Sequence, residues 1–154
     1  MGMNDFYITL VFDGAEIQIN NLNWKICGQT FISKCDVHNI ISDMSNARKV
    51  KENLYSINGN AELYLHINDN NDVVGIEIKD SFDNLEKDVR SLYEVCMRLK
   101  KLHLYNAFIC DEQCEIGNET ELADHIKRIY KDKYLFYQQS KKHHKRNILK
   151  KLFH

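Results

Sequence analysis

The sequence predicts an α+β domain built on a mostly antiparallel sheet of five or six strands. Strand patterns and helix patterns come in runs and not in strict alternation, which favours this class over a doubly wound sheet. Asp13-Gly14 and Asn58-Gly59 are dipeptides typical of tight hairpin turns between antiparallel strands. We expect two long C-terminal helices to pack on one face of the sheet, with one further helix inserted between the strand runs.

The first run of strands begins near the N-terminus. Residues rich in β-branched and aromatic side chains, or alternating between apolar and polar, predict strands over 6–12, 15–19 and 24–32. A set of apolar residues then recurs at helical spacing: Val37, Ile40, Ile41 and Met44. This spacing predicts a helix that is capped by Asp36 and ends near Lys51.

The second run is a predicted meander followed by helices. Apolar residues alternate with polar ones in three segments, at 54–57, 61–67 and 73–78. A helix capped by Asp80 or Ser81 is predicted to continue to about His103, because apolar residues recur along it every three or four positions. The remaining predictions are a strand or helix extension over 104–110, a loop over 111–117, and a helix over 118–139 that Asn118 caps.

Length and composition indicate one soluble domain. The chain has 154 residues, enough for one substantial core, and its formal charge of −1 is too small to suggest disorder. We assign residues 1–140 to the domain and residues 141–154 to a basic amphipathic tail or helix extension. No secretory signal or membrane-spanning stretch is present, and five cysteines form an odd set, so we expect a cytoplasmic protein with reduced thiols.

The segment 141–154 is the least ordinary part of the sequence. It contains no acidic residue and six basic ones: Lys141, Lys142, Lys145, Arg146, Lys150 and Lys151. The rest of the chain therefore has 15 basic and 22 acidic residues, a formal charge of −7. Clustered cations can neutralise nucleic-acid phosphates, dock on a membrane or partner, form the solvated end of the last helix, or fold back on the acidic domain. The first of these is our alternative hypothesis, a nucleic-acid-associated protein.

The cysteines suggest a weaker alternative, a small enzyme or a zinc protein. Four thiols could close a tetrahedral zinc site, although their spacing departs from that of the usual zinc motifs: Cys27, Cys35, Cys110 and Cys114. Cys35 and His38 could form a nucleophile and base at the start of a helix. No phosphate loop, nucleophile elbow or zincin helix is present, so we assign no catalytic residue and no cofactor.

Our leading hypothesis is a non-catalytic protein-interaction domain with an acidic body, such as an inhibitor or immunity-type protein. The chain has eight tyrosines, a residue type enriched at interfaces. The hairpin of Ala61 to Ser81 also resembles hairpins in some toxin-immunity proteins and in small bacterial domains of unassigned function, and we transfer no residue's role from it. The predicted partner-binding residues are Tyr64, Glu62, Glu77, Tyr134 and Tyr137.

Overall fold

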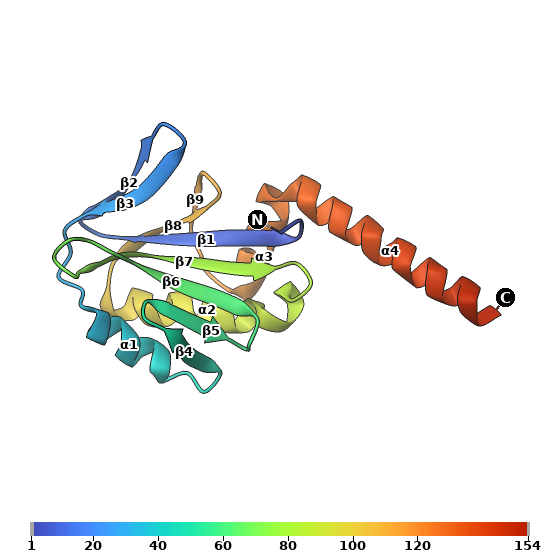
Figure 1. Cartoon of the computed structure of the whole chain (residues 1–154), viewed down its shortest axis with the longest axis horizontal. Coiled ribbons are helices and arrows are strands. Elements are labelled where there is room, and N and C mark those ends of the chain that lie inside the picture. The colour runs from blue at the N-terminus through green and yellow to red at the C-terminus, as the bar shows by residue number, and fades with distance from the viewer. Residues whose placement is uncertain (1, 154) are drawn as a thin grey trace.

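A computed structural model of the chain, which describes residues 2–153, shows an α+β fold with a seven-stranded antiparallel sheet (Figure 1). The strand order is β4-β5-β6-β7-β1-β8-β9. In chain order these strands are β1 (Asp5–Phe12), β4 (Ala47–Lys51), β5 (Leu54–Ile57), β6 (Ala61–Ile67), β7 (Val73–Ser81), β8 (Tyr105–Ile109) and β9 (Glu112–Cys114). The α+β class and the antiparallel pairing are confirmed, and the predicted count of five or six strands is too low.

The two outermost strands of this sheet, β4 and β9, were not predicted. The predicted helix over residues 36–51 ends early, because α1 covers only Lys34–Ser42 and the chain then turns into β4. Ser33 caps α1, and Asp36 is the third helical residue of its capping box, not the cap. Strand β9 lies inside the predicted loop over 111–117 and pairs with β8. Residues 104–110 form a strand and not a helix extension.

Strands β2 (Ala15–Asn20) and β3 (Asn23–Gly28) form a hairpin of their own that does not join the main sheet. The hairpin rises from one end of β1 in Figure 1. Its second strand ends at Gly28, short of the predicted end at residue 32. Alternation predicts a strand with one wet face, and it does not specify which sheet the strand joins.

Three helices cover one face of the main sheet and form the core with it. They are α1, α2 (Leu85–Leu102) and α3 (Glu119–Ile129). Helix α2 begins after Asn84, three or four residues later than the predicted cap at Asp80 or Ser81. The fully buried side chains between sheet and helices include Phe6, Ile8, Leu10, Ile76, Ile78, Leu92 and Leu99.

Helix α4 (Lys131–Phe153) leaves the body of the protein and points away from it (Figure 1). The predicted final helix over 118–139 is therefore two helices, separated at Tyr130, whose backbone is not helical. The first of the two predicted C-terminal helices is α2, and the second corresponds to α3 followed by α4. Helices α2 and α3 pack on the sheet, whereas α4 contacts the core only through residues of its first half. Among the described residues, no helix combines the length and apolarity that crossing a bilayer requires. Met1 and His154, and the side chain of Phe153, lie outside what the structure describes.

Candidate partner-binding surface

The face of the main sheet opposite the helices carries polar and aromatic side chains that remain partly or fully exposed. We call it the open face: Tyr7, Thr9, Glu62, Tyr64, His66, Glu77, Lys79 and Phe108. Alternation along each strand places these residues opposite the buried ones. The register sets Tyr64 of β6 directly across from Glu77 of β7, so the predicted placement of Glu62, Tyr64 and Glu77 on one face is confirmed.

Hydrogen bonds hold the side chains of this face in fixed positions. The Tyr64 hydroxyl donates to Glu62 Oε2 at 2.7 Å, and this bond to a carboxylate is the main cause that raises the pKa of Tyr64. His66 Nε2 lies 3.3 Å from Glu77 Oε2. The face therefore presents a tyrosine ring and an imidazole that are already oriented, each beside a carboxylate. Pre-oriented side chains lose less conformational entropy when a partner binds.

The hairpin extends this surface with apolar side chains. At its end, which we call the hairpin tip, lie Ile19, Leu22 and Trp24, with exposed fractions of 73%, 99% and 44%. Ile19 and Trp24 are directly opposite each other across the two strands. The Trp24 ring is 5.6 Å from the His66 ring, which makes the tip and the open face one continuous surface.

A small second core fixes the base of the hairpin against the sheet. Ile26 of β3 packs with Val11 of β1 and Val74 of β7, separately from the main core. Gly75 allows this approach: a Cβ atom at that position would lie 2.5 Å from Ile26 Cδ1 and 2.7 Å from the Leu10 carbonyl oxygen. The hairpin therefore depends on a residue without a side chain at position 75.

We expect Gly75→Ala to displace the hairpin and to lower the free energy of unfolding by about 1–3 kcal/mol, because the added methyl group overpacks the contact. Trp24 is the only tryptophan of the chain, so its fluorescence reports the hairpin directly. The emission maximum of Trp24 should shift to the red, and acrylamide should quench its fluorescence more strongly. Gly117→Ala is the matched control, because only the flexible Glu121 carboxylate must move there. Equal spectra for the two variants would contradict the role of Gly75.

Tyr134 and Tyr137 do not lie on this surface. They belong to α4 and pack on Phe82, with ring centroids 5.5 Å and 6.1 Å from it. The five predicted partner-binding residues therefore separate into a sheet group (Glu62, Tyr64 and Glu77) and a helix group. The helix group, Tyr134 and Tyr137, anchors α4 to the body. The presence of aromatic residues in the sequence does not by itself distinguish this role from partner binding.

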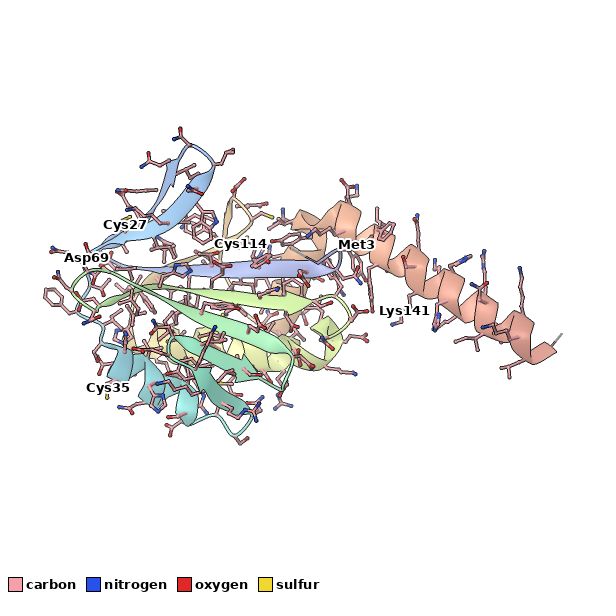
Figure 2. All side chains as sticks on the ribbon, in the orientation of Figure 1. Met3, Cys27, Cys35, Asp69, Cys114 and Lys141 are labelled. Carbon is pink, nitrogen blue, oxygen red and sulfur yellow. The ribbon has the colours of Figure 1, made fainter. Side chains whose placement is uncertain are left out.

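The structure does not bring the four candidate zinc ligands together. Cys27 lies in the hairpin, Cys35 in α1, Cys110 in the turn after β8, and Cys114 in β9. Cys27, Cys35 and Cys114 are well separated in Figure 2. Among residues 2–153, no three His, Cys, Asp or Glu side chains are placed to hold a metal ion. His38 Nδ1 is bonded to the Tyr55 hydroxyl at 2.9 Å, and among the described residues no hydrogen bond joins it to Cys35.

A buried acidic cluster was also missed by the sequence analysis. Asp80 and Asp88 are 4% and 0% exposed. The Asn58 amide donates to Asp88 Oδ1 at 3.0 Å, and the Asn46 amide donates to Asn58 Oδ1 at 2.8 Å. Burial, assisted by the nearby Asp88 carboxyl, raises the pKa of Asp80 from the ordinary 3.8 to about 8. These carboxyls are closed off from solvent, and the cluster joins α2 to two turns.

The most exposed apolar residues of the surface were not singled out from the sequence. Leu22 stands between asparagines in a predicted turn, where a leucine is unusual, and that is the one signal that could have identified it. No protein-family model matches the chain, and no curated protein and no solved structure matches it. The case for this surface therefore depends on its own geometry.

Proposed function

We propose that this protein is a non-catalytic interaction protein that binds a protein partner through the open face and the hairpin tip. The hairpin tip is the observation that carries the proposal. Three large apolar side chains are exposed on one projecting hairpin, and Leu22 is 99% exposed. Burying such a side chain contributes about 1.5–3 kcal/mol, so a partner that covers the tip gains substantial binding free energy. Tyrosine and tryptophan are the residue types enriched among binding hot spots.

The open-face residues beside the hairpin tip indicate which side chains a partner needs. Glu62 and Glu77 place two carboxylates on the open face, next to Tyr64 and His66. A partner with an apolar pocket for the hairpin tip and lysine or arginine side chains beside it complements this arrangement. An inhibitor or immunity-type protein, which acts by covering a surface of another protein, needs no catalytic group of its own. Five free thiols fit a protein of the reducing cytoplasm.

The test is capture of the partner from the native lysate with full-length wild-type protein and with single variants. We expect Leu22→Asp and Trp24→Ala each to weaken binding of a stoichiometric partner by at least about 30-fold, because hot-spot truncations cost 2 kcal/mol or more. The purified partner then provides dissociation constants by calorimetry.

Leu102→Asp is the matched control, since Leu102 is also an exposed leucine and lies at the end of α2, outside the hairpin tip and the open face. It should leave binding within about twofold, as expected for a residue outside an interface. Loss of binding in the control, or full binding by both tip variants, would refute the proposed surface.

A further inference from the structure

The second half of α4 is a cationic helix that the proposed function does not use. Its basic segment, residues 141–151, contains all six of the basic residues predicted for the tail and no acid, since Asp132 is the last acidic residue of the chain. Every residue of the segment is exposed. Among the described residues, none of its six cations forms an ion pair with the acidic body. The segment is therefore an exposed end of the last helix, one of the predicted alternatives, and among the described residues no ion pair supports the alternative in which it folds back on the acidic domain.

Five of the six cations lie within about half of the circumference of this helix. With about 3.6 residues per turn, Lys142, Arg146 and Lys150 form one row, and Lys141 and Lys145 lie on the neighbouring side. Lys151 lies outside this arc. Figure 2 shows side chains extending outward along the whole length of α4. The segment is thus positively charged over about half of its circumference, with Lys151 as a further charge outside that half.

This distribution argues against two other occupants. A membrane-surface helix needs a continuous apolar stripe, but the row that ends in Ile148 and Leu152 begins with Lys141 and Lys145. A second copy of the same helix, packed antiparallel, would bring like charges together at its centre. A polyanion that surrounds the helix complements it better than either.

The first half of α4 holds the basic segment in place. Tyr134 and Tyr137 pack on Phe82, and Lys141 Nζ lies 5.8 Å from the centre of the Tyr137 ring. The helix continues from this anchor away from the sheet (Figure 1). The basic segment begins ten residues into α4, about 15 Å along its axis. Its first cations, Lys141, Lys142 and Lys145, line one groove together with Asp83 and Glu86 of the body.

We propose that the basic segment of α4 binds double-stranded DNA by inserting into the major groove and neutralising phosphates on both of its walls. An α-helix with side chains is about 10–12 Å across, and the major groove of B-DNA is about 12 Å wide. The deep, narrow major groove of double-stranded RNA does not admit such a helix. Contacts to phosphates carry no base information, so the binding is independent of sequence.

The test measures binding of the full-length protein to a fluorescent DNA duplex of about 20 base pairs by anisotropy, over a range of salt concentrations. In the variant, glutamine replaces all six cations, because glutamine keeps helix propensity and removes charge. We expect the wild type to show a log–log salt slope of about −5 and the variant to show a slope near zero, with affinity at low salt reduced more than about 100-fold. Circular dichroism confirms that the variant retains its helices.

Two controls separate this proposal from others. Glutamine at Lys49, Lys51, Lys100 and Lys101, four exposed lysines of the body, should leave DNA affinity within about twofold. Leu22→Asp should also bind DNA normally, so failure of the protein-binding proposal is distinguishable from failure of this one. Equal binding to an RNA duplex, binding only to vesicles with anionic lipid, or undiminished DNA binding by the six-glutamine variant would each overturn the proposal.

Discussion

Replacing Phe82 with alanine is expected to lower the free energy of unfolding by about 3–5 kcal/mol and to release α4 from the body. Phe82 is 3% exposed, and its ring lies at the centre of an aromatic cluster. The ring centroids of four neighbours lie between 5.4 Å and 6.3 Å from it: Phe6, Tyr130, Tyr134 and Tyr137. Removing it leaves a cavity where Tyr134 and Tyr137 of α4 pack against the body of the protein.

Chemical denaturation measures the stability change, and hydrogen exchange of residues 131–153 measures the release of α4. Phe31→Ala is the matched control, because the same atoms are removed from a side chain that is fully exposed. The control should change stability by less than about 0.5 kcal/mol. A similar loss in both variants, or unchanged exchange protection of α4 in Phe82→Ala, would show that Phe82 does not anchor the helix.

Replacing Asp80 with asparagine is expected to stabilise the protein above neutral pH by about 2 kcal/mol. Burial and the Asp88 carboxyl raise the pKa of Asp80 to about 8 in the folded state, whereas the ordinary value is 3.8. The folded protein thus keeps a proton that the unfolded chain releases. Stability must therefore fall as the pH rises from about 4 to about 8. An asparagine amide carries no charge to bury and can still donate a hydrogen bond to the Asp88 carboxylate.

Urea unfolding at several pH values between about 4 and 9 tests this prediction. The wild type should lose stability across that window, and Asp80→Asn should show a much flatter profile. Asp83→Asn, at an exposed carboxylate three residues away, should leave the profile of the wild type unchanged. A variant that keeps the wild-type slope would mean that another group sets the pH dependence.

The sequence predicted those parts of the fold whose signals are local. Asn58-Gly59 connects the paired antiparallel strands β5 and β6, and the stripe that predicts α2 faces the core. The hairpin predicted at Asp13-Gly14 is wrong: this turn links β1 to β2, but β2 pairs with β3 in a separate sheet, because a turn dipeptide does not specify which strands pair. Strand β4 was missed because Ala47–Lys51 is mostly charged and has no alternation. It is a strand because it hydrogen-bonds to β5 at the edge of the sheet, and that partner is not visible in its own composition.

Only some residues of the candidate surface could likewise be placed from local signals in the sequence. Glu62, Tyr64 and Glu77 could be placed on one face because period-two alternation and hairpin register are readable from the sequence. The exposure of Trp24 could not be predicted, because it depends on the hairpin leaving the main sheet instead of pairing with it. Asp80 was interpreted as a helix cap, and its burial results from where α2 packs on the sheet.

Strand β1 has a consequence for how the chain is made. Among the strands of this sheet it is the first to be synthesised, yet its partners are β7 on one side and β8 on the other. Its apolar residues, such as Ile8 and Leu10, pair with strands that are synthesised much later. Until then the nascent chain carries an unpaired apolar strand, the kind of segment that attracts chaperones and promotes aggregation. Strand β1 has both partners only when translation has passed Ile109, and β9 joins the sheet after that, so the domain completes its folding late.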